Sequence, residues 1–324
     1  MPRGNGLGSK GFWIIKACAN MLVDLWALPS RLSTTSFKFR RYQSMKLKLV
    51  RHLWGVDLAH GLQHYLPRWR DVGYEALEVS IRFVPDRGAF LRFLSDNKFQ
   101  WIPQIFSNDF IPGGTVREHL DSLRVQMEEC LDHASLFFNA HSGYDNWSFA
   151  EALDFYGEVL DLEKKIGLPI SHETHRQRYF ATPWQTREIL KKFPDLRVTC
   201  DFSHWVCVCE RLLPDMGETI AVAARQCHHL HARVGFEEGP QVPDPAAPEY
   251  AAHLKAHEGW WDVIWKFQAG RGMQVSTLTP EFGPPPYLHT LPHTNVPVAD
   301  LANVCDWMAV RERTNFESGQ FVSR

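Results

Sequence analysis

The pattern of hydrophobic and polar positions repeats one unit along most of the chain. From residue 48 onward, short apolar runs alternate with stretches whose apolar residues recur at helical spacing. The apolar runs predict eight strands, at residues 48–56, 74–82, 99–106, 135–141, 168–174, 197–202, 228–234 and 274–282. Helical spacing is clearest at 115–131, 149–166, 183–192 and 250–268.

Two of these helices have clear start signals. Ser148 with Glu151, and Thr182 with Gln185, fit capping boxes, in which two side chains satisfy free amide groups of the first turn. Pro183 strengthens the second signal, because proline is favoured at the first helical position. We therefore expect helices to begin at these points.

Strands that alternate with helices indicate parallel strands joined by right-handed crossovers. Eight such units in about 280 residues fit a (β/α)8 TIM barrel in number and length. The main alternative is an open doubly wound sheet, which usually has a glycine-rich phosphate turn after its first strand. The chain has DLAHG there instead. We expect an α/β fold, with a (β/α)8 barrel over residues 48–310 and a C-terminal tail at 311–324.

Residues 1–47 differ from the rest of the chain in charge. They are rich in lysine and arginine, their only acid is Asp24, and serine and threonine cluster at 30–36. This bias resembles a mitochondrial transit peptide, but a disordered extension before a start near Met45 is the favoured interpretation. The apolar run at 11–28 is interrupted by Lys16 and Asp24, so it is a poor membrane span. We expect a cytoplasmic location, with mitochondria as the alternative, and no membrane partner.

The overall composition narrows the function classes. The 324 residues are 44% hydrophobic and 22% charged, which is ordinary for a soluble globular protein. A formal net charge of −2 gives no basic face for nucleic acid. The seven cysteines show no CxxC spacing, as expected for reduced thiols of an intracellular protein. Sixteen histidines and twelve tryptophans suit a deep pocket with apolar walls, or a plain core.

Ionisable residues stand at the ends of four consecutive predicted strands. In a TIM barrel these ends form the face that carries the active site. The residues are Glu173, Asp201, either His229 or His231, and Glu281. Three carboxylates that converge would repel one another, and a divalent cation removes that cost. Oxygen ligands with one imidazole suit one Mn²⁺ ion best, with Mg²⁺, Co²⁺ or Zn²⁺ as alternatives.

The alternation of a strand assigns further residues to faces. Side chains two apart point to the same side, so Asn139 and His141 share a face. If Glu173 points inward, its neighbour His172 points toward the helices. Glu78 lies deeper in its strand than the residues at the strand ends.

Four segments together resemble a known superfamily. They are SHETHRQRYFATPW (171–184), VTCDFSHW (198–205), HHLHARVGFEEGPQVPDP (228–245) and LTPEFGPPPY (278–287). Over residues 48–310 the chain resembles the xylose isomerase-like TIM barrel superfamily, and within it the sugar phosphate isomerase/epimerase proteins. The resemblance implies that the metal ligands are Glu173, Asp201, His231 and Glu281. It also implies that His204, the histidine of the DxxH motif, faces the substrate.

The resemblance implies an isomerase or epimerase that acts on a sugar, a sugar phosphate or a sugar acid. The metal would chelate adjacent carbonyl and hydroxyl oxygens, and Glu173 or Glu281 would remove the proton next to the carbonyl. His204 and Arg233 would stabilise the charge that develops on the oxygen. The catalytic residues would therefore be Glu173, Glu281 and His204.

Further residues are expected to bind the substrate. His141 and Trp184 would line the pocket, although Trp184 could instead pack on the core. Arg233 could alternatively pair with Glu237 or Glu238.

Two positions depart from the ketose 3-epimerases of the family. Tyr179 and Glu237 stand where those proteins have a glutamate and an arginine that grip the far end of the sugar. Arg176, Arg178 and Arg233 lie near the expected mouth, where they would bind a carboxylate or a phosphate, or simply be solvated. The expected partner is a small carbohydrate, with the anionic forms left open.

Two other functions stay as alternatives. A zinc-dependent apurinic endonuclease of this superfamily would need an Asp-x-His after the seventh strand, and the chain has Asp244-Pro245-Ala246 there. A sugar-binding barrel without catalysis is the second alternative. The proline-rich loop at 240–250 could be a lid, a contact surface of a homodimer, or a rigid connector.

Overall fold

A computed structural model describes residues 44–109, 111–133, 136–319 and 321. The basic segment expected at 1–47 lies outside the described residues, apart from its last four positions. Among the described residues, no helix is both long and apolar enough to cross a membrane.

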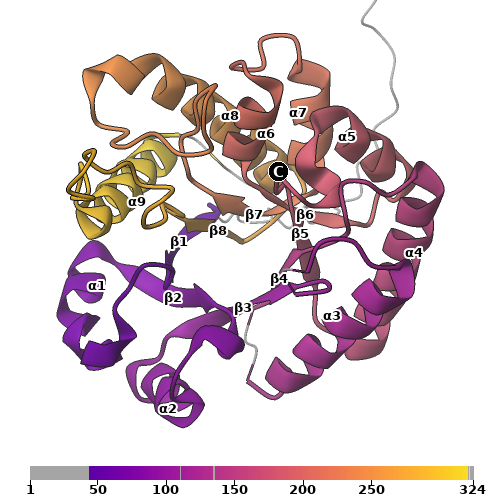
Figure 1. Ribbon diagram of the computed structural model, residues 1–324, viewed down its shortest axis with the longest axis horizontal. Helices are drawn as coiled ribbons and strands as arrows, with labels where there is room; N and C mark the ends of the chain where they lie inside the picture. Colours follow the sequence, from indigo (N-terminus) through magenta and orange to yellow (C-terminus); the bar gives the residue numbers. More distant parts are fainter. Residues whose placement is uncertain (1–43, 110, 134–135, 320, 322–324) are drawn as a thin grey trace, which may run out of the picture. The chain divides into compact units, whose positions relative to one another are not determined.

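Eight parallel strands close into a barrel in the order in which they occur along the chain, as predicted (Figure 1). They are β1 (Lys46–His52), β2 (Tyr74–Val79), β3 (Gln100–Phe106), β4 (Phe138–His141), β5 (Ile170–Glu173), β6 (Arg197–Cys200), β7 (Cys227–His231) and β8 (Val275–Thr279). The barrel closes where Lys46–Leu49 of β1 pair with Val275–Leu278 of β8. This closed parallel sheet excludes the open doubly wound alternative.

Helices surround the barrel and connect its strands (Figure 1). They are α1 (Leu66–Val72), α2 (Arg87–Asn97), α3 (Val116–Cys130), α4 (Phe149–Ile166), α5 (Pro183–Lys192), α6 (Phe202–Cys209), α7 (Gly217–Gln226), α8 (Ala251–Gly270) and α9 (Leu301–Ser318). The four helices expected from periodicity correspond to α3, α4, α5 and α8, within two residues at each end.

The barrel domain was expected to span residues 48–310, but one strand and one helix extend beyond these limits. β1 begins at Lys46, and α9 continues past residue 310 to Ser318. The reason is packing, because Met308 and Phe316 of α9 are both buried in the main apolar core. The segment expected as a tail at 311–324 therefore begins as the second half of a packed helix.

The capping signals hold with one difference. At the start of α4, Ser148 and Glu151 make both bonds of a capping box. At the start of α5, Thr182 accepts from the Gln185 amide, but the Gln185 side chain meets the Thr182 hydroxyl instead of its backbone.

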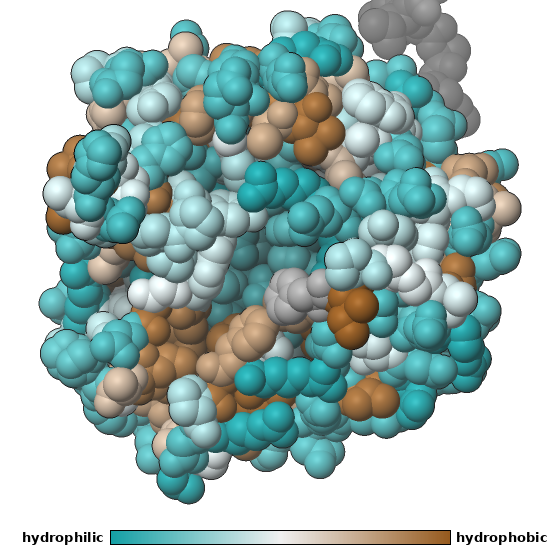
Figure 2. Space-filling view, viewed as in Figure 1, coloured by the Kyte–Doolittle hydropathy of each residue, from teal (hydrophilic) through white to brown (hydrophobic). Residues whose placement is uncertain are grey.

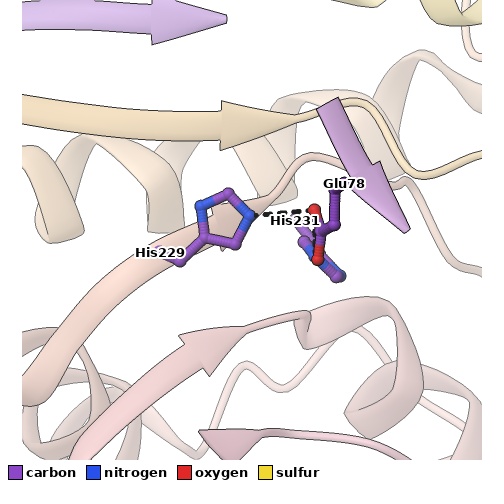
Figure 3. A group of neighbouring side chains, drawn as sticks. All are labelled: Glu78, His229 and His231. Atoms are coloured by element: carbon purple, nitrogen blue, oxygen red, sulfur yellow. Dashed lines mark hydrogen bonds and ion pairs between the residues drawn. The ribbon is translucent and has the colours of Figure 1, made fainter. Parts of the chain in front are cut away.

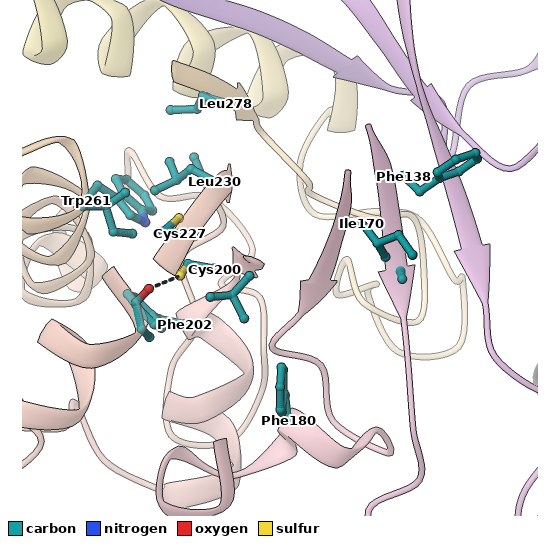
Figure 4. Packing of buried hydrophobic residues seen from close by; sticks show 14 of the residues in the cluster. Phe138, Ile170, Phe180, Cys200, Phe202, Cys227, Leu230, Trp261 and Leu278 are labelled. Carbon is teal, nitrogen blue, oxygen red and sulfur yellow. Dashed lines mark hydrogen bonds between the residues drawn. The ribbon is translucent and has the colours of Figure 1, made fainter. Parts of the chain in front are cut away.

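The core has two parts, and the smaller part supports the site. The large part lies between strands and helices and contains outward-facing side chains such as Ile170, Leu230 and Leu278 (Figure 4). The small part lies inside the barrel and consists of Val50, Ala76, Ile102 and Phe137. Because alternate strand residues share a face, the next inward positions of β1, β2 and β3 are polar. These positions are His52, Glu78 and Gln104.

Candidate metal centre

Four buried side chains from β5 to β8 form one cluster at the carboxyl ends of the strands. Each offers a ligand atom that lies within 4.8 Å of the others, and the four are Glu173, Asp201, His231 and Glu281. Glu173 and His231 are the last residues of β5 and β7, Asp201 follows β6 directly, and Glu281 lies two residues after β8. The structure therefore brings together the four residues expected to hold a metal.

The chemistry of the cluster fits a divalent cation. Glu173 Oε1 and His231 Nδ1 are buried and have no hydrogen-bond partner among the described residues. His231 Nδ1 lies 3.0 Å from Glu281 Oε2 and 3.6 Å from Glu173 Oε2, without hydrogen-bond geometry. Buried polar atoms without a partner are costly, and a cation bound between these atoms would satisfy them. Three carboxylates and one imidazole are also a donor set that binds Mn²⁺, Mg²⁺ or Zn²⁺.

The pKa values show a tightly coupled group. Burial favours the neutral acid, yet the imidazole of His231 lowers the pKa of Glu281 to about 2. Burial raises the pKa of Asp201 to about 6, although the Arg233 guanidinium opposes this. Burial disfavours a charged His231, but Glu281, Glu78 and Glu173 together raise its pKa well above the ordinary value. Without a metal, a charged His231 imidazole and the Arg233 guanidinium together offset the carboxylates of the cluster.

Arg233 belongs to this cluster and does not pair with Glu237 or Glu238. Its Nη2 donates to Asp201 Oδ2 at 2.5 Å and lies 3.4 Å from Glu281 Oε2. Glu237 instead pairs with His253, at 2.9 Å. The strand pattern explains the placement, since Arg233 stands two residues after His231 and shares its face.

The DxxH segment ends β6 and begins α6. Asp201 is the N-cap of α6, where its Oδ1 accepts from the Ser203 amide at 3.0 Å. This cap places His204 in the first turn, and its Nε2 accepts from Arg233 Nη2 at 2.7 Å. Burial lowers the pKa of His204 well below the ordinary value. His204 therefore contacts the cluster through Arg233 and is neutral.

Two side chains of β4 hold Glu173 in place. His141 Nε2 lies 2.8 Å from Glu173 Oε2, and Asn139 Nδ2 donates to the same oxygen at 3.0 Å. Both side chains point inward, so they share a face as the strand alternation predicted. His172 points the other way, toward the helices, where its Nδ1 meets Ser142 Oγ at 2.7 Å.

A second polar layer lies beneath the cluster, at Glu78 of β2. Its carboxylate contacts the imidazoles of both His229 and His231, and Figure 3 shows these three side chains. His229 Nε2 meets Glu78 Oε2 at 3.2 Å, and its Nδ1 meets Thr277 Oγ1 at 2.7 Å. This arrangement assigns His231 to the four-residue cluster and His229 to the layer below. The groups Glu78–His229–His231 and His141–Glu173–His175 also have the spacing of metal ligands.

A cavity of about 560 Å³ leads to the cluster at Glu281. Figure 2 shows a hollow at the centre of this face, with hydrophobic side chains gathered on one side of it. The polar part of the lining comprises His52, Gln104, His141, His175, Gln177, Arg178, Arg233 and Glu281. The apolar part comprises Leu53, Trp54, Val56, Leu58, Val79, Phe83, Phe106 and Tyr287.

Sequence reasoning missed His52 and Gln104. His52 Nε2 lies 3.4 Å and Gln104 Nε2 3.5 Å from Glu281 Oε1, so both contact the oxygen on the cavity side. Both occupy inward positions near the ends of β1 and β3. The four cluster residues were found by looking for ionisable side chains at the ends of the later strands. The same search would have found His52 and Gln104 if it had included uncharged polar side chains and the first three strands.

Three other residues were expected near the substrate: Arg178, Arg176 and Trp184. The structure places them differently relative to the cavity. Arg178 lines the cavity, but it donates to the carbonyls of Ser107 and Asp109 at 2.8 and 2.7 Å, and burial lowers its pKa to about 10. Arg176 stacks on the Tyr287 ring. Trp184 is 45% exposed near the start of α5 and is not brought to this cavity.

No protein-family model and no curated protein matches the sequence. Solved structures do share the fold. A D-tagatose 3-epimerase-like protein is 13% identical with a TM-score of 0.56, covering 84% of this chain and 98% of that chain. D-allulose 3-epimerase from Methylomonas sp., solved in complex with D-allulose, is 13% identical with a TM-score of 0.54, covering 86% and 99%.

A third structure is a xylose isomerase-like TIM barrel protein from Mycobacterium smegmatis in complex with magnesium. It is 11% identical with a TM-score of 0.55, covering 85% of this chain and 97% of that chain. At such identities the likeness shows the fold alone. The chain has the xylose isomerase-like TIM barrel fold, as the sequence segments predicted.

Proposed function

We propose that this protein is a metal-dependent isomerase or epimerase of a small carbohydrate, which it binds as a sugar, a sugar acid or a sugar phosphate. The observation that carries the proposal is the pair of buried carboxylates Glu173 and Glu281 within one ligand cluster, with Glu281 open to a cavity. The fold shared with a sugar epimerase that binds D-allulose supports the choice of substrate class.

Glu173, Asp201, His231 and Glu281 would hold the cation, and Mn²⁺ is our first choice. When bound, such an ion polarises a carbonyl oxygen and offsets negative charge that develops there. The residues themselves then have to move a proton, orient the substrate and limit the access of water.

Glu281 is the residue best placed to take the proton from the carbon next to the carbonyl. Its Oε1 faces the cavity beside His52 and Gln104, while its Oε2 faces His231 and Arg233. The low pKa of about 2 keeps it ionised near neutral pH, as a base must be. Glu281 would return this proton to the neighbouring carbon, which moves the carbonyl. Inversion of the centre would instead need a proton from the other side, which Glu173 can deliver only if it enters the step as the protonated acid.

Arg233 and the histidines would stabilise and orient the reacting group. The Arg233 guanidinium is buried and lines the cavity, so a substrate oxygen that gains negative charge would lie near a fixed positive charge. His141 and His175 also line the cavity, with ring centroids 4.4 Å apart. Arg178 is less available for an anionic substituent, because backbone carbonyls already occupy its Nη1 and Nη2 groups.

The test begins with metal content. We expect elemental mass spectrometry of the purified protein, reconstituted with Mn²⁺, to find about one ion per chain. Glu281→Gln should bind the ion more weakly, while Glu249→Gln, an exposed change, should bind it normally. Absence of binding after reconstitution would overturn the proposed metal centre.

The second step measures the reaction. We expect the reconstituted protein to exchange the α-proton of one member of a panel of keto sugars, sugar acids and sugar phosphates with deuterium, as followed by NMR. Glu281→Gln should lower this rate by at least about 100-fold, the lower range for loss of a general base. Metal binding without exchange in any member would instead favour a binding protein.

A further inference from the structure

Glu78 is a buried carboxylate beneath the ligand cluster, and the proposed reaction does not use it. It comes from β2, a strand that supplies none of the four ligands. Its side chain is fully buried, and although burial opposes ionisation, His231 and His229 hold its pKa well below the ordinary value. A buried charge of this kind is costly unless it is paired and hydrogen-bonded.

Four donors from three other strands converge on this carboxylate. Oε1 accepts from Asn139 Nδ2 at 2.8 Å and from His231 Nε2 at 3.1 Å. Oε2 accepts from His229 Nε2 at 3.2 Å and from the Thr279 hydroxyl at 2.6 Å. His231 Nε2 also lies 3.2 Å from Oε2. Each oxygen therefore has at least two partners, and the charge is satisfied within the barrel.

The contact with His231 decides which ring nitrogen is free for a metal. Because Nε2 donates its hydrogen to Glu78, Nδ1 is the nitrogen that faces Glu281 and Glu173. A hydrogen bond from one ring nitrogen to a carboxylate fixes the tautomer and orientation of a ligating histidine and makes it more basic.

A second link runs from Glu78 to Glu173. The Asn139 amide donates to Glu78 Oε1 at 2.8 Å and to Glu173 Oε2 at 3.0 Å, so one side chain joins the two carboxylates. Two of the four ligands are thus oriented from the same point below the cluster.

We propose that Glu78 is a positioning residue, which fixes His231 as an Nδ1 ligand and, through Asn139, orients Glu173. This inference rests on the metal centre proposed above. It predicts that the affinity for the cation depends on a strand that gives no ligand.

The test is Glu78→Gln, which keeps the size of the side chain and removes its charge. We expect the dissociation constant for Mn²⁺, measured by calorimetry without substrate, to rise about 10- to 100-fold. The visible absorption of the Co²⁺ form should change as well, because the ligand geometry is altered. A purely structural role for Glu78 would leave that spectrum unchanged in the folded, metal-saturated variant.

Thr277→Val is the matched control, because Thr277 bonds His229 in the same layer and is not among the residues bonded to Glu78. It should leave both the dissociation constant and the Co²⁺ spectrum as in the wild type. Equal losses in both variants would point to general packing and would overturn the inference.

If Glu78→Gln does not fold, Asn139→Ala tests the second link, and it too should weaken binding. If the wild type binds one ion and neither Glu78→Gln nor Asn139→Ala weakens it, the inference fails while the metal centre stands. If the wild type binds no ion, the proposed function fails with it.

Discussion

Arg233 changes the charge balance of the cluster. Glu173, Asp201 and Glu281 supply three negative charges, and the buried guanidinium contacts the last two of these residues. One arginine and one divalent cation would together neutralise the three carboxylates. Arg233 is therefore part of the site. The family resemblance implied that it faces the substrate, but not that it contacts Asp201 and Glu281.

Removal of this arginine should destabilise the metal-free protein. Arg233→Gln leaves Asp201 and Glu281 without their guanidinium partner, and loss of one partner of a buried pair typically costs about 3–5 kcal/mol of unfolding free energy. Addition of Mn²⁺ should restore part of this loss, because the cation takes over the neutralisation. Urea unfolding with and without Mn²⁺ measures both effects.

Arg176→Gln provides the control for that prediction. Arg176 stacks on Tyr287 at the cavity and does not touch the carboxylates of the cluster, so its loss should cost much less. Equal destabilisation in the two variants would show that the Arg233 contacts contribute little.

The four residues of the cluster could be predicted because each stands at a strand end with a side chain that can bind a metal. The choice between His229 and His231 could not be made from alternation, since both face inward. Their different roles follow from depth in the barrel, which depends on the register of β7 against β8, where His231 pairs with Thr279. Trp184 was expected to line the pocket, but it does not. Its position at the start of a helix, shortly after the fifth strand, does not determine the direction of its side chain.

At the scale of elements, the strands and four helices follow closely from the apolar pattern. α6 does not, because its segment FSHWVCVC has only eight residues, most of them apolar, which is too short a stretch to distinguish a helix from a buried strand. α1 has only seven residues, too few for a periodic signal. The apolar wall of the cavity could not be predicted either, since it is assembled from segments after β1, β2 and β8 and from the strands β2 and β3.

The helix α9 should make stability depend on pH. Glu312 is buried, and burial together with the nearby Glu258 carboxylate raises its pKa to about 8. Above the ordinary value of 4.5, the unfolded chain releases a proton that the folded protein still holds. This group should therefore lower the unfolding free energy as pH rises from 4.5 to about 8, by up to about 1.4 kcal/mol per pH unit.

Glu312→Gln removes this titration and should flatten the pH dependence in that window. Stability near neutral pH should rise, because the uncharged amide needs no proton. Urea unfolding across the window checks this, with Glu317→Gln on the exposed side of the same helix as the control. A slope that stays as steep in Glu312→Gln would contradict the assignment.

At the scale of the whole molecule, the lining of the cavity is polar on one side and apolar on the other. Its polar half adjoins the ligand cluster, and its other half is apolar, with Trp54, Val56 and Phe83 among its residues. A fully hydroxylated sugar would leave hydroxyl groups without partners against this wall, which is unfavourable. We therefore expect the cavity to prefer ligands with one apolar face.

A pair of chelators tests this preference on the metal-loaded protein. Benzohydroxamate and acetohydroxamate present the same chelating group, but only the first carries a ring. Benzohydroxamate should bind about tenfold more tightly, a difference of about 1.4 kcal/mol. Trp54→Ala should reduce this advantage, and Phe149→Ala, at an exposed position outside the cavity lining, should leave it intact. Equal affinity for both compounds in the wild type would contradict the role of the wall.

The small apolar cluster inside the barrel has a kinetic consequence. Val50, Ala76, Ile102 and Phe137 pack in the interior below the polar layer, and the cavity that reaches Glu281 lies on the other side of that layer. In the proposed reaction, the substrate and the product would therefore share this cavity and compete for it. In a reversible interconversion, each compound should then act as a competitive inhibitor of the turnover of the other.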